Sequence, residues 1–404
     1  MPEYKGMAYL KQKLDAKRPR VLTRYKFYEM KYSVRDHMIS TPPHMKHLQY
    51  KLGWCTKAVD TLANRLRFRG FADDNFDMEG IYAQNNRDIL FDSAILGALI
   101  SSCDFIYISV DADGFPKLTV IDGGNATGVI DETTLLLKEG YAVLERDKDG
   151  KVVSEAYLTP GVTQFYRNGK PDGTLRTDAP YPLLVPVIHR PDAVRPFGHS
   201  VISRACMDHT KEASRTIKRM VVSSEFFSFP QRYALGTDPN MEPMDKWKVT
   251  MSSLLEISKD DEGNAPTLGQ FQQQSMEPHI AQLRAHASLF SGETGLMLDD
   301  LGFATENPSS ADAIRATHEN LRLAAASAQK DFGIGFINAG YLAACIRDEY
   351  AYRREQVYLT TALWEPIFEP DAAALSGIGD AAQKIQSAFP DYFTEEKLRA
   401  LTGI

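Results

Sequence analysis

The sequence predicts an α+β protein, in which helix-forming and strand-forming stretches follow one another along the chain. Three observations carry this prediction. Apolar residues recur every three or four positions over 51–68 and again within 200–226. Between these segments, 104–188 is rich in β-forming residues and is divided by Asp-Gly and Asn-Gly turns. With 404 residues, the chain is long enough for two or three domain-sized units.

The composition narrows the class of protein. A net charge of −7 argues against a protein that coats DNA with its whole surface, but is compatible with one that encloses DNA without gripping it. No two cysteines form a CxxC pair, which favours buried free thiols in a reducing cytoplasm; they are Cys55, Cys103, Cys206 and Cys345. The longest apolar run is too short to span a bilayer, and the N-terminus lacks the apolar segment of a signal peptide. We therefore expect a soluble, unsecreted protein.

Helical segments are expected up to residue 103. Residues 1–50 are helical in pattern and mixed in charge, and the basic residues Arg18, Arg20 and Arg24 are most simply a solvated helix face. The segment 51–68 predicts an amphipathic helix that stops near Gly70. Residues 85–103 form a helix that is apolar on nearly all sides, as is typical of a buried one.

The stretch 104–188 predicts an antiparallel β region with hairpin turns at 111–114, 147–150 and 168–169. Its Asp-rich turns also invite a calcium-binding interpretation. A calcium loop beginning at Glu145 would need an acidic residue where the chain has Ala156, and strands flank it instead of helices. A plain hairpin is the favoured interpretation.

The segment 181–236 reads as a strand, a turn-rich loop, a long helix over 200–226 and a second strand after Pro230. Steps of 4, 3, 4 and 3 residues place a set of polar side chains on one stripe of this helix: Arg204, Asp208, Lys211, Arg215 and Lys218. This stripe is either the outer face of a packed helix or a surface that faces a neighbouring subunit or an aqueous channel. Its mixed charge favours pairing between subunits over a grip on DNA.

The rest of the chain is mainly helical. Lys246, Trp247 and Lys248 lie in a short amphipathic segment, and a second helix is expected over 276–291. A loop that bears glycines and acids then leads to a helix from Ser309 to about residue 352, with Asn307 or Ser309 as its N-cap. Glycines within this helix predict a kink or a close helix contact; they are Gly333, Gly335 and Gly340. Residues 366–404 are expected to form two short helices broken by Pro390.

Motifs that define common enzymes are absent from the sequence. There is no GxxxxGK[ST] phosphate-binding loop and no GxSxG nucleophile turn, and His318-Glu319 is not followed by a histidine at metalloprotease spacing because position 322 is Arg. The histidines are dispersed. A two-metal nuclease needs only a few carboxylates, so this alternative stays open at the level of sequence.

Several short phrases, taken in order, resemble the portal proteins of tailed bacteriophages of the siphophage type. The resemblance covers most of the chain, from about Tyr25 to Ile404. The phrases are 25–29 (YKFYE), 185–187 (VPV) with 197–200 (FGHS), 229–232 (FPQR), 307–314 (NPSSADAI), and 392–396 (YFTEE) with 401–404 (LTGI). No single phrase is diagnostic, but their order is fairly specific.

The resemblance implies a portal fold with a helical and β wing, two stem helices, a small α/β clip, a long wing helix after a tunnel loop, and a short helical crown. The implied boundaries are a wing over 1–198, stem helix 1 over 199–229, a clip over 230–275, stem helix 2 over 276–295, a tunnel loop over 296–308, the long wing helix and its return over 309–365, and a crown over 366–404.

The resemblance also implies where the working surfaces lie. The tunnel loop would approach DNA through Leu298, Asp299, Asp300, Gly302, Phe303, Glu306 and Asn307. The stem would carry the polar stripe named above. The clip would dock the terminase motor and later adaptor proteins through Arg232, Lys246, Trp247 and Lys248. Because 296–308 contains no Lys or Arg, it suits a channel through which DNA slides.

The function implied is that of a ring, expected to be a dodecamer, at one capsid vertex, through which DNA is packaged and ejected. The implied partners are double-stranded DNA bound without regard to sequence, the terminase large subunit, the major capsid and scaffold proteins, and head-completion proteins. The resemblance implies no catalytic residue, metal, cofactor or membrane, and a virion protein that is assembled in the host cytoplasm. The alternatives are another phage head or connector protein, or a metal-dependent nuclease.

Overall fold

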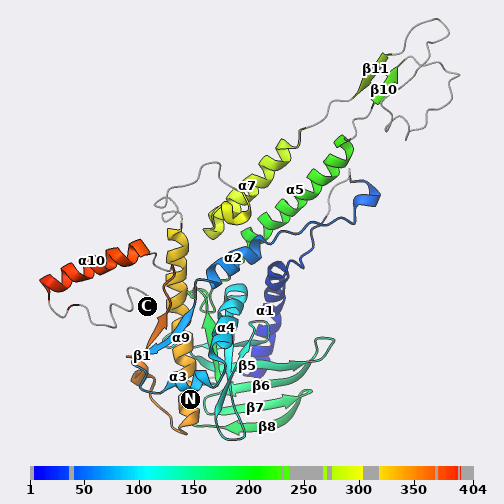
Figure 1. Cartoon of the computed structure of the whole chain (residues 1–404). Coiled ribbons are helices and arrows are strands. Elements are labelled where there is room, and N and C mark those ends of the chain that lie inside the picture. Colours follow the sequence, from blue (N-terminus) through cyan, green and yellow to red (C-terminus); the bar gives the residue numbers. More distant parts are fainter. Residues whose placement is uncertain are drawn as a thin grey trace, which may run out of the picture. The chain divides into compact units, whose positions relative to one another are not determined.

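The computed structural model describes residues 4–35, 41–228, 232–235, 267–270, 275–303, 318–368, 372–389 and 392 (Figure 1). The chain divides into two compact units. Unit 1 comprises 1–32, 53–204 and 294–404, and unit 2 comprises 33–52 and 205–293. Helices and strands are both abundant, so the α+β prediction is confirmed.

The helices of unit 1 cluster around the strands. They are α1 (Met7–Tyr28), α2 (Trp54–Ala63), α3 (Met78–Ala83), α4 (Arg87–Ser101), α9 (Glu319–Arg347) and α10 (Ala372–Ala388), with the short 3₁₀ turns η2 (Asp299–Leu301) and η3 (Arg354–Val357). The expected buried helix over 85–103 is α4, and its inner positions are almost inaccessible to solvent.

The strands of unit 1 form three antiparallel sheets. Strands β1 (Phe68–Ala72) and β12 (Thr361–Trp364) pair, and a second sheet has the order β3 (Pro116–Ile121), β2 (Cys103–Val110), β9 (Leu184–Ile188). The third sheet is a meander of β4 (Ala126–Ile130), β5 (Leu137–Arg146), β6 (Val152–Thr159), β7 (Val162–Arg167) and β8 (Lys170–Arg176). The turns predicted at 111–114, 147–150 and 168–169 join β2 to β3, β5 to β6 and β7 to β8.

The core of unit 1 forms where α9 packs on β2 and β9. Six aromatic rings from distant parts of the chain pack together in this core, with distances of 4.3–6.2 Å between ring centroids. They are Phe68, Phe71, Tyr82, Phe91, Phe336 and Trp364. Helix α9 can approach so closely because of its glycines. A Cβ at Gly335 would lie 3.3 Å from the carbonyl oxygen of Pro186, and one at Gly340 would lie 2.8 Å from the sulfur of Met78. The close contact predicted for these glycines is present.

Two buried glutamates fasten α1 to the five-stranded sheet. Glu139 on β5 accepts hydrogen bonds from the backbone nitrogens of Lys5 (2.8 Å) and Gly6 (3.0 Å), just before the helix begins. A carboxylate at this end of a helix is favoured by the helix dipole. Glu155 on β6 binds Lys11 Nζ at 2.6 Å. The N-terminal half of α1 is thus fixed by charge as well as by apolar contact.

Unit 2 is built on two antiparallel helices, α5 (Arg204–Ser228), whose first residue belongs to unit 1, and α7 (Glu277–Thr294). The rings of His209 and His286 lie 5.9 Å apart, and Ser223 Oγ lies 3.4 Å from His279 Nε2. A short 3₁₀ turn, η1 (Pro43–Met45), belongs to the same unit. Strands β10 (Arg232–Leu235) and β11 (Thr267–Gln270) form an antiparallel ribbon.

Three expected boundaries differ from those observed. The amphipathic helix expected over 51–68 is the shorter α2, and Gly70, expected to stop it, lies within β1 at a register shift opposite β12. The helix expected over 200–226 begins at Arg204, because Ser200 and Val201 bind the end of α4 instead. The expected caps at Asn307 and Ser309, and Pro390, lie outside the described residues.

Candidate functional site

The polar stripe of α5 is exposed at its start and covered further along. Arg204 is exposed, and Asp208 and Lys211 form a surface pair at 3.5 Å with side chains that are 73% and 38% accessible. Arg215 is only 16% accessible and binds Glu212. The stripe is therefore not one continuous outer face, and its first three members, Arg204, Asp208 and Lys211, are those that solvent reaches most.

Lys218 departs most from the expectation. It is 7% exposed, and its ammonium group donates a hydrogen bond to the carbonyl oxygen of Lys46 at 3.0 Å. Periodicity placed Lys218 on the stripe correctly, but the segment around η1 covers that end of the helix. The expectation that Lys218 faces outward is wrong for the isolated chain, because its charge is used inside unit 2.

The first part of the expected tunnel loop is a compact turn. Leu296 and Leu301 are buried, η2 packs on α2, and Asp300 accepts a hydrogen bond from the backbone nitrogen of Met297 at 3.2 Å. Gly302 follows with φ +88°, a conformation that favours glycine. This turn also includes Leu298, Asp299 and Phe303. Glu306 and Asn307 lie outside the described residues.

The expected clip is described only at its base. Arg232 begins β10, whose register with β11 runs from Arg232 opposite Gln270 to Leu235 opposite Thr267. Lys246, Trp247 and Lys248 lie outside the described residues. The chain thus pairs with itself between the two helices: β10 follows α5, and its antiparallel partner β11 precedes α7.

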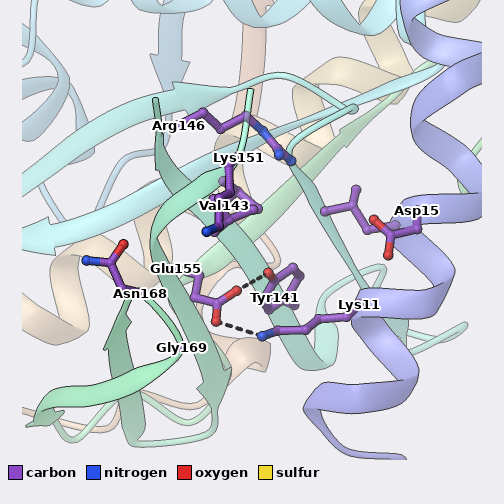
Figure 2. A pocket seen from close by; sticks show the side chains of 11 residues that line it. Lys11, Asp15, Tyr141, Val143, Arg146, Lys151, Glu155, Asn168 and Gly169 are labelled. Carbon is purple, nitrogen blue, oxygen red and sulfur yellow. Dashed lines mark hydrogen bonds and ion pairs between the residues drawn. The ribbon is translucent and has the colours of Figure 1, made fainter. Parts of the chain in front are cut away.

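A pocket of about 400 Å³ lies between α1 and the five-stranded sheet. Figure 2 shows Glu155 pointing at both Tyr141 and Lys11, with Arg146 and Lys151 above them. Burial and the carboxylate of Glu155 raise the pKa of Tyr141 well above its usual range. Arg146 donates to Asn125 Oδ1 at 2.8 Å and to the carbonyl oxygen of Gly150 at 2.9 Å. Since Glu155 binds both Lys11 and Tyr141, this side of the pocket holds α1 in place.

A second pocket, of about 600 Å³, lies among α1, α2 and α4 and is acidic. Its charged lining residues are Asp60, Arg67, Asp88, Asp92 and Glu365. Burial and the neighbouring charge of Asp88 raise the pKa of Asp92. Asp60 accepts a hydrogen bond from Tyr28 at 2.9 Å, so one of its acids is already engaged in the fold.

Metal-binding clusters and membrane-spanning helices are both absent from the described part of the chain. There, no three side chains of His, Cys, Asp or Glu gather as a metal site. The four cysteines are buried as free thiols, as the sequence predicts. None of the described helices has the length and apolar character needed to cross a bilayer.

Two buried charges in unit 1 have no signal in the sequence pattern. Asp104 on β2 is 2% exposed, and its Oδ1 accepts hydrogen bonds from Ser101 Oγ (2.7 Å) and the backbone nitrogen of Gly123 (2.9 Å). The ammonium group of Lys17 is buried without a hydrogen bond and lies 5.1 Å from the Phe105 ring centroid. A single acid at the start of a strand has no periodicity that would reveal its burial.

The comparisons with curated proteins point to one class, the structural proteins of bacteriophage particles. The chain is 25% identical over 307 residues to the portal protein of Mycobacterium phage L5, which takes in 70% of this chain and 62% of that protein. It is 24% identical over 318 residues to the portal protein of Mycobacterium phage D29, with 73% and 65% covered. Within that class the similarity is to portal proteins, which confirms the resemblance drawn from the sequence phrases. The matches span less than two thirds of these relatives.

No protein-family model matches the chain. Among solved structures, it is similar to a chain in the virion of a native gene transfer agent particle, with a TM-score of 0.46, 11% identity, and 87% and 89% of the two chains covered. A chain in the neck of an empty gene transfer agent particle, computed with C6 symmetry, gives a TM-score of 0.48, 13% identity, and 87% and 90% covered.

Proposed function

We propose that this chain is the subunit of a phage portal, a ring at one capsid vertex through which double-stranded DNA enters and leaves. The observation that carries the proposal is the 25% identity to the portal protein of phage L5 over 70% of the chain. Its role is structural: the subunit forms a passage and does not catalyse a reaction, and DNA translocation is driven by a separate terminase.

The order of elements supports this proposal. Two antiparallel helices, α5 and α7, flank a β ribbon and are followed by a turn and the long helix α9. We assign α5 and α7 to the stem, the ribbon and 236–266 to the clip, 296–308 to the tunnel loop, and 1–198 with 309–365 to the wing. Residues 366–404 correspond to a short crown.

A ring needs two different complementary faces on each subunit, since the contact between neighbours is heterologous. Asp208 and Lys211 on α5 are exposed and opposite in charge, so we propose that they belong to one such face. A dodecamer is the expected stoichiometry. The acids Asp299 and Asp300 in the proposed tunnel loop suit a lining that does not hold DNA phosphates.

The remaining partners follow from the same assignment. We propose that the clip docks the terminase large subunit and then head-completion proteins, and that the wing meets the major capsid and scaffold proteins. The protein would be assembled in the host cytoplasm and would remain in the virion.

Mass photometry combined with negative-stain electron microscopy of the purified chain tests the proposal. The expected result is rings of roughly a dozen subunits with a central hole, since closed symmetry is the usual outcome of heterologous contacts. A chain that stays monomeric in the presence of its capsid and scaffold proteins would contradict a portal role.

A further inference from the structure

Helix α1 concentrates positive charge in a chain whose net charge is −7. Its basic side chains are Lys11, Lys13, Lys17, Arg18, Arg20, Arg24 and Lys26, and its acid is Asp15. The lysines of the first half serve the fold: Lys11 binds Glu155, and Lys13 donates a hydrogen bond to the carbonyl oxygen of Gly128 at 2.7 Å. The arginines of the second half have a different environment.

That environment is the C-terminal end of α4. Arg24 Nη1 donates a hydrogen bond to the carbonyl oxygen of Ser101 at 2.8 Å. Ser200 Oγ donates to the carbonyl oxygens of Leu99 (3.2 Å) and Ile100 (2.6 Å). Because α1 and the segment before α5 bind neighbouring carbonyl groups at the end of α4, Arg24 lies near that segment, and the exposed Arg204 follows it as the first residue of α5.

The parts of the chain that these hydrogen bonds bring to the end of α4 supply four arginines: Arg20 and Arg24 from α1, Arg195 from the loop after β9, and Arg204 from α5. We call this set the arginine cluster. Arg20 Nη2 donates a hydrogen bond to the carbonyl oxygen of Ala16 at 3.3 Å, and Arg195 Nη1 lies 3.4 Å from His199 Nδ1. Burial and the positive charges of the other three members lower the pKa of Arg24. Arg20, Arg195 and Arg204 are exposed.

No acid of the described chain forms an ion pair with the cluster. Asp192, in the same loop as Arg195, is engaged elsewhere. Its Oδ2 lies 2.6 Å from His199 Nε2, and its Oδ1 accepts from the backbone nitrogens of Val194 (2.8 Å) and Arg195 (2.6 Å). The cluster is therefore a positive surface whose members repel one another.

We propose that the arginine cluster binds the phosphodiester backbone of a nucleic acid without regard to base sequence. Neighbouring guanidinium groups repel one another in the isolated chain, and an anion bound between them replaces this repulsion with attraction. A guanidinium group matches a phosphate with two parallel hydrogen bonds. Because phosphates recur at every nucleotide and carry no sequence information, arginines presented by separate elements fit the backbone without regard to base sequence.

An acidic peptide is the competing ligand, and the surface fits it less well. None of the four arginines lines either pocket described above, so the cluster offers charge without a recess for a peptide side chain. The site does not depend on the portal assignment. That assignment specifies only that the nucleic acid is duplex DNA. The arginine cluster would then hold the DNA, whereas the acid-bearing tunnel loop would let it slide.

The test measures binding of a fluorescently labelled duplex DNA of mixed sequence to the full-length chain, as a function of salt concentration. The variant is Arg20→Gln with Arg195→Gln, which leaves Arg24 on the end of α4. Each phosphate contact contributes about 0.9 to the slope of log K against log salt, so the variant should lower the slope by about 2. Its affinity at low salt should fall by roughly tenfold or more.

The matched control is Lys148→Gln with Lys170→Gln, which removes the same charge from two exposed positions on the β-hairpins. It should bind DNA as the unaltered chain does. An unchanged slope in the arginine variant, or an equal loss in the lysine control, would overturn the proposal. So would displacement of the DNA by polyglutamate at equal charge concentration, because the ligand would then be an acidic protein.

Mass photometry on the same samples separates this proposal from the proposed function. Rings with an unchanged DNA slope in the arginine variant would refute the cluster and leave the portal assignment standing. A lowered slope in a chain that stays monomeric even in the presence of its capsid and scaffold proteins would support the cluster and refute the portal assignment.

Discussion

At the scale of single residues, buried carboxylates hold the wing of the proposed portal together. Glu139 and Glu155 bind the start of α1, and Asp104 sits beneath α4. Each accepts several hydrogen bonds, which offsets the cost of removing a carboxylate from water. Their environments differ, so their substitution is expected to have different consequences.

Asp104 should make stability depend on pH. Burial raises its pKa to about 7, so the folded state keeps a proton that the unfolded state releases near about pH 4. The free energy of unfolding therefore falls as pH rises through this window and levels off above about 7. Asp104→Asn should not show this fall. Its free energy of unfolding should therefore rise by about 2 kcal/mol relative to that of the unaltered chain between about pH 5 and pH 7.

Urea unfolding at several pH values measures this difference. Asp113→Asn, at an exposed position in a hairpin turn, is the control and should follow the unaltered chain. If the Asp104→Asn and unaltered curves stay parallel across the window, Asp104 is ionised in the folded protein and the expectation is wrong.

Glu139 should matter for stability because it accepts hydrogen bonds from three groups. Glu139→Ala removes the acceptor for the backbone nitrogens of Lys5 and Gly6 and for the hydroxyl of Tyr157. Hydrogen bonds to a charged group contribute about 1.5–3 kcal/mol each, and we expect a loss of about 2–4 kcal/mol in the free energy of unfolding. Thermal unfolding should show no comparable loss for Glu132→Ala, which alters an exposed glutamate.

At the scale of elements, helix packing depends on particular glycines. An ideal Cβ on Gly97 of α4 would lie 1.7 Å from Oδ2 of Asp104. No rotation of a methyl group relieves such an overlap, so either the helix or the buried carboxylate must move. Gly292 of α7 has nothing within 4 Å of the same position.

Gly97→Ala should therefore lower the free energy of unfolding of unit 1 by more than about 3 kcal/mol. In an unobstructed helix the same substitution normally raises stability by about 1 kcal/mol. Gly292→Ala should show only that gain. Denaturant unfolding of the two variants makes the comparison. Equal effects would mean that α4 can shift away from β2 at little cost.

The elements that the sequence predicts well are those determined by local pattern. The hairpins of 104–188 follow from turn residues and β-formers, and α4, α5 and α7 follow from periodicity. The pairing of β1 with β12 was missed because the two strands are short and far apart in the chain. The residues of the stripe all lie in α5, but the burial of Lys218 has no signal in the sequence, since it is held by a backbone carbonyl that any residue at position 46 would supply.

At the scale of the whole molecule, the two ends of that stripe should behave differently. Lys211→Glu changes an exposed charge beside Asp208 and should reduce ring formation at physiological salt, with a change in monomer stability within about 0.5 kcal/mol. Lys218→Glu buries a repulsive charge against a carbonyl oxygen and should impair folding itself. Mass photometry and thermal unfolding of both variants separate assembly from folding.

The tunnel-loop assignment also has its test at this scale. Deletion of residues 302–306 removes the end of the loop but leaves the buried Leu296 and Leu301 in place. Rings should form normally, whereas DNA packaging or retention should be lost. Rings that fail to form at all would place this segment in an interface between subunits.

The order of segments in unit 1 has a consequence for how the protein is made. The aromatic core joins Phe68 and Phe91 to Phe336 and Trp364, so it closes only after α9 and β12 have left the ribosome. Until then, β2, β9 and α4 expose apolar surface, although the five-stranded sheet from β4 to β8 is already complete. Contacts between such distant segments form slowly. Nascent chains that end before α9 should therefore be retained by chaperones, and release into subunits ready for assembly should coincide with synthesis of the last quarter of the chain.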